Sequence, residues 1–220
     1  QRVLRQLLWG LGWMQALLRR RRAMRDHQVL DRAAVALQAL QAAHQHETVD
    51  EAALAVVNDL ATSLRVDRVS LGLLVRGDVR LRAISRSAWF ERKSDLGQSL
   101  ENAMEEATDQ EACVIHPQVP SAGQARVCVA QRDLAIRAGA ASVLSAPLFG
   151  HGSVVGAITL ERHEGTFDAD DALLGGLLGE LIGPAFEAQL RLERWFAGRA
   201  QVKLRTAYDR LVGPRWPAAK

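Results

Sequence analysis

The sequence has few of the residues that mark secreted or metal-binding chains. Only two cysteines, Cys113 and Cys128, occur in 220 residues, so a disulfide framework is excluded and a reducing compartment is expected. Their spacing is not that of the close pairs found in zinc sites, and we expect neither a metal nor another cofactor. No secretory signal is recognisable at the N-terminus. These absences favour a cytoplasmic protein.

A long uninterrupted apolar run is also lacking. Residues 3–18 are mostly apolar, but Arg5 and Gln15 interrupt the run and arginines occupy 19–22. A membrane-spanning helix needs about 20 predominantly apolar residues. The segment is therefore too short and too polar to be predicted as a membrane span.

Charge is distributed unevenly along the chain. The net charge is +3 overall, but it is +6 over residues 1–46, −9 over 47–190 and +6 over 191–220. Basic segments of this kind bind nucleic acids or the anionic face of a membrane, or they simply solvate the outer faces of helices. No nucleic-acid-binding motif accompanies the charge. We therefore expect no nucleic acid, and keep an anionic membrane surface and plain solvation as alternatives.

Hydrophobic periodicity divides the chain into a helical arm over 1–46, a central domain over 47–190 and a second helical arm over 191–220. In the central domain, Thr48-Val49-Asp50-Glu51 matches a capping box, which predicts a helix to about residue 65. We then expect two strands (67–75 and 79–87), a helix (95–108), a short strand (112–117) and a loop (117–130). A short helix (131–139), two more strands (142–149 and 153–163) and a long helix from 168 onward complete the order. These elements predict an α+β fold, in which an antiparallel sheet has its helices packed on one face and is extended by long N- and C-terminal helices.

The stretch Gly150-His151-Gly152 has the look of a phosphate-binding or catalytic loop. It lacks the third glycine and the following helix of a dinucleotide fingerprint, and it lacks the Lys-Ser/Thr of a Walker loop. Glycines that take positive φ are common in tight hairpins. We therefore expect a hairpin turn with His151 in water, where it is a poor general base.

Several residues in the second half of the chain resemble the signature of the GAF domain family. That signature is a Gly, a Ser in a strand that ends in Pro-Leu, a hairpin, a Gly-x-Ile/Leu-x-Leu strand and an aromatic-Asp pair before a closing helix. The matching positions are Gly139, Ser142, Pro147, Leu148, Gly156, Ile158, Leu160, Phe167 and Asp168. The resemblance covers about residues 48–190. It implies a non-catalytic sensor or regulatory domain of signal transduction.

The resemblance also implies where a ligand would bind. In this family the pocket would lie between the sheet and the segment 95–130, and five residues could face it: Ser85, Trp89, His116, Arg126 and Cys128. Each could equally belong to the surface or the core. The motif of the cyclic-nucleotide-binding members is absent, and no chromophore-attaching cysteine is recognisable, so the ligand stays open.

Three functions remain as alternatives. The first is a ligand sensor, and the second is a structural dimerisation module with a vestigial pocket. The third is a thiol enzyme similar to the GAF-fold reductases of free methionine sulfoxide, which would need Cys113 or Cys128 as a low-pKa nucleophile. Apolar stripes over 29–40 and 173–195 further predict a homodimer in which the helical arms pair as a coiled coil.

A narrower resemblance concerns the two arms. They are similar to regions that flank GAF domains in bacterial membrane adaptors of the haemolysin-secretion type. This resemblance implies a membrane-associated bacterial protein whose span begins beyond Lys220. The basic second arm would then place the domain on the cytoplasmic side.

Overall fold

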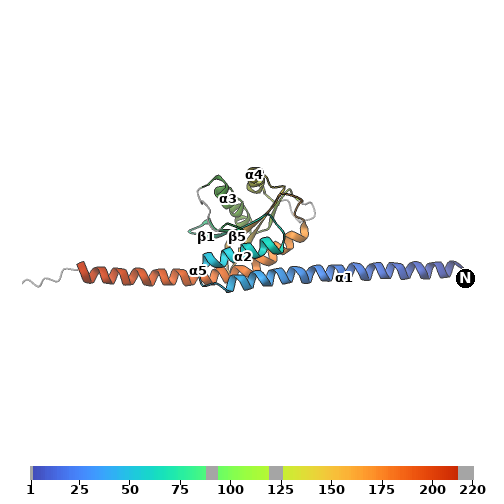
Figure 1. Ribbon diagram of the computed structural model, residues 1–220, viewed down its shortest axis with the longest axis horizontal. Coiled ribbons are helices and arrows are strands. Elements are labelled where there is room, and N and C mark those ends of the chain that lie inside the picture. Colours follow the sequence, from blue (N-terminus) through green and yellow to red (C-terminus); the bar gives the residue numbers. More distant parts are fainter. Residues whose placement is uncertain (1, 88–93, 119–125, 213–220) are drawn as a thin grey trace, which may run out of the picture.

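A computed structural model describes residues 2–87, 94–118 and 126–212 of the chain (Figure 1). Helices and strands alternate in the central domain, and a long helix lies at each end. In chain order the elements are α1 (Arg2–His44), α2 (Val49–Ser63), β1 (Arg68–Val75), β2 (Asp78–Ile84), α3 (Asp95–Asp109), β3 (Val114–His116), α4 (Val129–Ala138), β4 (Ser142–Phe149), β5 (Val154–Arg162) and α5 (Ala169–Val212).

The strands form one antiparallel sheet in the order β2-β1-β5-β4-β3. The two late strands occupy the middle of the sheet, because β5 pairs with β1 on one side and with β4 on the other. The predicted α+β class, the antiparallel sheet and the two long terminal helices are therefore confirmed.

Helices cover both faces of this sheet rather than one, as Figure 1 shows. One hydrophobic cluster joins α1, α2 and α5 to the face that carries Leu71, Leu144 and Ile158. A second cluster joins α3 and α4 to the opposite face, which carries Val143 and Ala157. The prediction of helices on one face was wrong in this respect. Strands β4 and β5 are buried along almost their whole length, as strands covered on both faces must be.

The first turn of α2 and the end of α4 follow the local sequence rules. Thr48 is the N-cap of α2, and its side-chain oxygen accepts a hydrogen bond from the backbone N–H of Glu51. Gly139 ends α4 in the left-handed conformation with φ 66°, which a residue without a Cβ adopts without strain. These two signals therefore fix where α2 begins and where α4 ends.

Close backbone contact holds α5 against β4. A Cβ added to Gly179 would collide with the carbonyl oxygen of Pro147, and one added to Gly183 would collide with the backbone of Phe149. Gly175, one turn earlier, faces Ala146 and Leu144. The three glycines are four residues apart and share one helix face. They allow the helix to lie directly on the strand.

The long helices extend away from the sheet in opposite directions (Figure 1). Where they pass each other, Arg32 of α1 forms an ion pair of 2.8 Å with Asp170 of α5. Further along, the side-chain amide of Gln189 donates to the carbonyl of Ala43 at 2.7 Å. Among the described residues, no helix contains a stretch long and apolar enough to cross a membrane.

Candidate functional site

The sheet face beneath α3 and α4 carries a row of three hydroxyl groups. Ser70 of β1, Thr159 of β5 and Ser145 of β4 are register partners on adjacent strands, and all three are fully buried. Ser145 and Thr159 share a hydrogen bond of 3.0 Å. Among the residues that the structure describes, the hydroxyl of Ser70 finds no hydrogen-bond partner. Adjacent strands lie about 4.8 Å apart, so the row spans about 10 Å.

A buried ion pair lies two residues further along the same strands. Arg68 donates to Glu161 through Nε at 2.7 Å and through Nη2 at 2.6 Å, in the planar two-bond geometry that guanidinium and carboxylate prefer. The carboxylate is fully buried, whereas the Arg68 side chain is 22% exposed. Hydrogen bonding to Glu161 raises the pKa of Arg68, although burial opposes the rise. We call Arg68, Ser70, Ser145, Thr159 and Glu161 the polar floor.

Alternation along each strand places the polar floor on the α3/α4 side. Val69 and Leu71 of β1, like Leu144 of β4, belong to the cluster on the opposite face. Because neighbouring residues of a strand point to opposite faces, Ser70 and Ser145 point toward α3 and α4. Val143 and Ala157 of the α3/α4 cluster share this face with them.

Side-chain hydrogen bonds tie α3 and α4 into one unit above the floor. The carboxylate of Glu106 accepts from the backbone N–H groups of Val129 and Ala130, the first residues of α4. This carboxylate takes the place of a side-chain cap, because the N-cap residue Cys128 makes none. The buried amide of Gln131 donates to the carbonyl of Ala103 at 2.7 Å. A displacement of α4 from the sheet would therefore carry α3 with it.

Two of the predicted site residues lie at opposite edges of the sheet. Ser85 follows β2, and its hydroxyl accepts a hydrogen bond of 3.0 Å from the backbone N–H of Val69. His116 ends β3, points to the α3/α4 face as Val114 does, and is half-buried. Burial and the charge of Arg132 lower the pKa of His116. Four strand spacings, about 19 Å, separate the two edges, so the structure does not bring this pair together.

The other predicted site residues are found near the start of α4 or outside the described residues. Arg126 is exposed, and its charge only partly offsets the rise that burial causes in the pKa of the Cys113 thiol. Cys128 is half-buried, and its sulfur lies 3.5 Å from the side-chain amide nitrogen of Gln118. Trp89 lies outside the described residues.

Cys113 belongs to the opposite face of the sheet. It packs against the cluster of α1, α2 and α5, next to Gly175. Burial raises the pKa of its thiol from 9.0 to about 12. A thiol with such a pKa is protonated at neutral pH and is a poor nucleophile.

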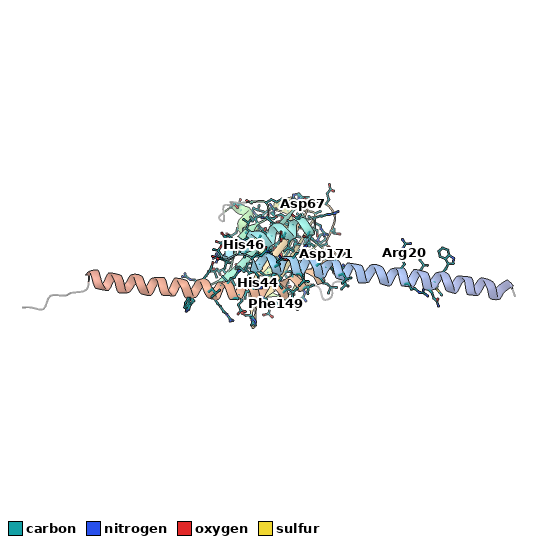
Figure 2. The ribbon with its side chains drawn as sticks, turned by 60° about the horizontal axis from the view of Figure 1, so that its bottom comes forward. Arg20, His44, His46, Asp67, Phe149 and Asp171 are labelled. Atoms are coloured by element: carbon teal, nitrogen blue, oxygen red, sulfur yellow. The ribbon has the colours of Figure 1, made fainter. Side chains whose placement is uncertain are left out.

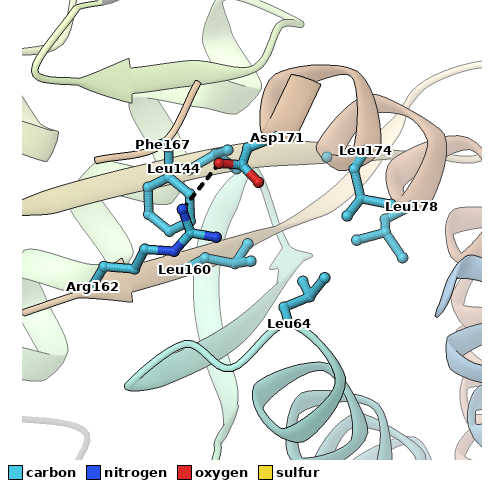
Figure 3. A pocket seen from close by; sticks show the side chains of 9 residues that line it. Leu64, Leu144, Leu160, Arg162, Phe167, Asp171, Leu174 and Leu178 are labelled. Atoms are coloured by element: carbon cyan, nitrogen blue, oxygen red, sulfur yellow. Dashed lines mark hydrogen bonds and ion pairs between the residues drawn. The ribbon is translucent and has the colours of Figure 1, made fainter. Parts of the chain in front are cut away.

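The cavity on the α5 side is too small to hold a ligand. It lies between α5 and the sheet, beside the ion pair of Arg162 and Asp171 at 3.0 Å (Figure 3). Its volume is about 10 Å³, which is the space of a single water molecule. A larger hollow of about 240 Å³ separates the outer surfaces of α3 and α4, but it is open to solvent. Within the described ranges, no group of three His, Cys, Asp or Glu side chains is placed to hold a metal ion.

The Gly150-His151-Gly152 stretch forms the predicted turn between β4 and β5, closed by a hydrogen bond from the Gly150 N–H to the Ser153 carbonyl. Neither glycine has a positive φ, so the reason given for them from sequence was wrong. At Gly150 a Cβ would instead collide with Glu187 of α5. His151 is exposed, but it donates its backbone N–H to Glu187 at 2.9 Å, and its Nδ1 lies 2.8 Å from the same carboxylate.

Sequence reasoning missed all five residues of the polar floor. A signal was present, since Ser70, Ser145 and Thr159 each interrupt an otherwise apolar strand. In a strand buried on both faces, a hydroxyl must find a partner within the protein or in a ligand. The signal could be interpreted only once the register had placed the three strands side by side.

Comparison with known proteins agrees with this architecture. The GAF domain family model matches residues 48–185. None of the curated proteins matches the chain significantly.

Three solved structures illustrate the similarity in fold. The GAF domain of A. aeolicus nlh2 in an inactive state has a TM-score of 0.54 at 16% identity, over 74% of this chain and 99% of that one. The photosensory core module of the Stigmatella aurantiaca phytochrome has a TM-score of 0.52 at 16% identity, over 73% of this chain and 37% of that one. The free methionine-R-sulfoxide reductase of Neisseria meningitidis, in complex with its substrate, has a TM-score of 0.50 at 16% identity, over 73% of this chain and 91% of that one.

At these identities the neighbours establish the fold alone, whereas the family model covers more than half of the chain. With its antiparallel sheet between two layers of helices, the chain belongs to the GAF domain family.

Proposed function

We propose that this chain is a non-catalytic regulatory GAF domain that binds a small molecule on the polar floor and relays its occupancy to α5. The observation that carries the proposal is the unpartnered hydroxyl of Ser70, fully buried beside the Ser145–Thr159 pair and the Arg68–Glu161 pair. An unsatisfied buried hydroxyl costs about 1–3 kcal/mol. A hydroxyl kept at such a cost is accounted for when a ligand supplies its partner.

The relay follows from the two faces of β4. Ser145 points toward the proposed ligand, while Pro147 and Phe149 offer their backbone to Gly179 and Gly183 of α5. Packed interfaces move as rigid bodies rather than deform. A shift of β4 on binding would therefore move α5, which leads out of the domain.

A second copy of the chain is the partner that the arms favour. Leu30 and Leu37 of α1 are seven residues apart on one helix face, and both are more than half exposed, as are Leu173 and Leu192 of α5. Much of each long helix projects beyond the sheet (Figure 1), and isolated helices are marginally stable in water. Pairing with a second copy would bury these leucines and stabilise the projecting turns.

An anionic membrane surface is a further proposed partner of the first arm. Arg19 and Arg20 are exposed, and Figure 2 places Arg20 on the part of α1 that projects from the domain. Vesicles that contain anionic phosphatidylserine should therefore co-sediment with the chain more than neutral phosphatidylcholine vesicles do. Equal co-sedimentation would remove this partner. A cytoplasmic location and the membrane-adaptor context stay predictions.

The thiol-enzyme alternative finds no support in the placement of the cysteines. Cys113 is half-buried on the α5 side with its thiol protonated, whereas Cys128 stands at the N-terminus of α4. The similarity to the methionine sulfoxide reductase concerns the fold. The structural-module alternative, with a vestigial pocket, is decided by the following experiment.

A crystal structure of the full chain, purified without denaturation after cytoplasmic expression, tests the proposal. We expect non-protein electron density in contact with the Ser70 and Thr159 hydroxyls. Mass spectrometry of small molecules released on denaturation should identify the same compound and should find less of it in Ser70→Ala than in Ser153→Ala, a change on the exposed hairpin. Absence both of non-protein density at the floor and of any released compound would overturn the proposal in favour of a structural module.

A further inference from the structure

Three large apolar side chains share one face of the projecting part of α1. Trp13, Met14 and Leu17 are 58%, 57% and 53% exposed, and we call them the apolar triad. Leu17 follows Trp13 by four residues and Met14 by three, so the three side chains are neighbours on the helix surface. Gln15 and Arg19 point to the other side, because successive residues of a helix are turned by about 100°. This part of α1 is therefore amphipathic.

The apolar triad lies away from the folded domain. Arg32 of α1 pairs with Asp170 of α5, and Leu17 precedes Arg32 by 32 − 17 = 15 residues. At about 1.5 Å per residue, this separation is about 22 Å along the helix axis. Figure 2 shows Arg20, which follows Leu17 by three residues, on the part of α1 that projects from the domain. The triad is therefore open to a partner outside the domain.

The face of α1 that is proposed to bind a second copy is a different one. Leu30 and Leu37 share one direction, which at about 100° per residue is turned by about 160° from the mean direction of the triad. Pairing through these leucines leaves the triad on the outside of the pair. Parallel pairing through the triad would instead bring Arg20 close to its counterpart, because Arg20 follows Trp13 by one heptad, and like charges repel.

The arginines that follow the triad indicate which partner fits it. Residues 19–22 are all arginine, and residues 1–46 carry a net charge of +6. Arg19 and Arg20 are exposed, and an arginine can place its charged head among phosphates while its stem covers apolar surface. Tryptophan and a basic cluster on an amphipathic helix are typical of helices that lie in the interface of an anionic membrane.

We infer that α1 lies in the plane of an anionic lipid surface and inserts Trp13, Met14 and Leu17 between the headgroups. This inference rests on the proposed membrane partner and adds the mode of binding, which is insertion of apolar side chains in addition to attraction between charges. The two contributions respond differently to salt, because ions screen exposed charges but do not remove the gain from burying apolar surface.

Co-sedimentation of the full-length chain with vesicles of equal parts phosphatidylserine and phosphatidylcholine tests the inference, at about 0.1 M and about 1 M sodium chloride. We expect part of the wild-type binding to persist at the higher salt concentration. Leu17→Glu should lower the partition coefficient by about fiftyfold, because it removes an inserted side chain and adds a negative charge. Gln15→Glu adds the same charge on the opposite side of the helix and should lower the coefficient by about fivefold or less.

The outcomes separate this inference from the proposed partner. Equal losses in Leu17→Glu and Gln15→Glu, or complete release of the wild type at the higher salt concentration, would overturn insertion and leave the anionic surface as a partner. Absence of wild-type binding at both salt concentrations would overturn the partner together with the inference. The urea midpoint should be the same in both variants, because the two positions are remote from the sheet, and this control verifies that the domain is intact.

Discussion

At the scale of single residues, the surroundings of Cys113 suppress the reactivity of its thiol. The thiol of Cys113 has its pKa raised to about 12 by burial against the α5 cluster. Compared with a thiol at 9.0, its thiolate fraction at pH 8 is about a thousandfold smaller. Cys128 is half-buried at the N-terminus of α4. Both residues are half-buried, so the suppressed thiolate of Cys113, and not a difference in exposure, is what protects it.

Alkylation with iodoacetamide at pH 8 should accordingly label Cys128 at least tenfold faster than Cys113. Peptide mass spectrometry of quenched time points provides the two rates. Both cysteines should react at similar rates once the chain is unfolded in urea, which serves as the control. Fast labelling of Cys113 in the folded chain would contradict its placement and would revive the thiol-enzyme alternative.

Glu187 predicts a dependence of stability on pH. Hydrogen bonds from the backbone and side chain of His151, with further support from Arg191, lower the pKa of Glu187 from 4.5 to about 2. Folding therefore favours its charged form, and this contribution is complete above pH 4.5 and is lost as the pH falls toward 2. The urea midpoint of the wild type should fall more steeply between pH 5 and pH 3 than that of Glu187→Gln. Identical slopes, with Glu180→Gln as the matched change on α5, would contradict the hairpin contact.

Only part of the site could be predicted from the residues. Ser85 has the right polarity, but the sheet ladder uses its hydroxyl at Val69. His116 points to the correct face, yet it is on an edge strand. Ser70 escaped notice because a serine in a strand is ordinary until its partners are known to be absent. Whether a buried hydroxyl lacks a hydrogen-bond partner depends on strand register and packing, and neither can be read from the local sequence.

At the scale of elements, α5 is positioned by glycines, which leave one face of the helix without side chains. Gly175, Gly179 and Gly183 bring its backbone onto β4, whereas Gly176 has open space beside it. Glycine in a helix interior costs about 1 kcal/mol relative to alanine. The three docking glycines are therefore retained for contact with the strand, against their local preference.

Gly179→Ala and Gly176→Ala should change stability in opposite directions. The new Cβ at Gly179 would collide with the carbonyl oxygen of Pro147, so we expect a loss of about 1–3 kcal/mol. At Gly176 nothing lies within 4 Å, so the gain in helix propensity should raise the free energy of unfolding by about 1 kcal/mol. Chemical denaturation measures both values. Equal effects of the two substitutions would argue against close docking of α5.

The elements themselves were largely predictable because each carries a strong local pattern. Capping residues and apolar periodicity located α2 and α3 within a few residues. Strand β2 departs from simple alternation at its end, where Ala83 and Ile84 are both buried. The pairing shifts between Leu71 and Gly72, with Ala83 and Leu81 as their partners, so Arg82 is an additional residue. Such a bulge reverses the faces beyond it, and it has no reliable local signature.

At the scale of the whole molecule, the two arms are its most extended feature, and they predict the oligomeric state. The chain has a mass of 24.1 kDa, and sedimentation equilibrium at micromolar concentration should give twice that value. Leu30→Glu combined with Leu37→Glu places charge on the exposed face of α1, so the variant should sediment as a monomer. Ile136→Glu, on an equally exposed apolar side chain of α4, should remain a dimer. A monomeric wild type would remove the second copy from the account.

The arrangement of the layers could not be read from the sequence. Local patterns show that a helix has one apolar face, but they do not show which side of the sheet it covers. The long-range partners of α3 decide this, since Glu105 and Glu101 accept hydrogen bonds from the backbone N–H groups of Val79 and Leu81 on the edge strand β2. These contacts bring α3 to the face opposite α5, and so close the polar floor.

The free energy of unfolding of Ser70→Ala tests the central claim most directly. If the Ser70 hydroxyl is kept for a ligand, its removal from the ligand-free chain deletes an unsatisfied buried group, and stability should rise by about 1 kcal/mol. Ser145→Ala deletes a satisfied hydroxyl and should lower stability by about 1 kcal/mol. A loss of stability in Ser70→Ala as large as that in Ser145→Ala would show that the Ser70 hydroxyl serves the fold, and would contradict the ligand site.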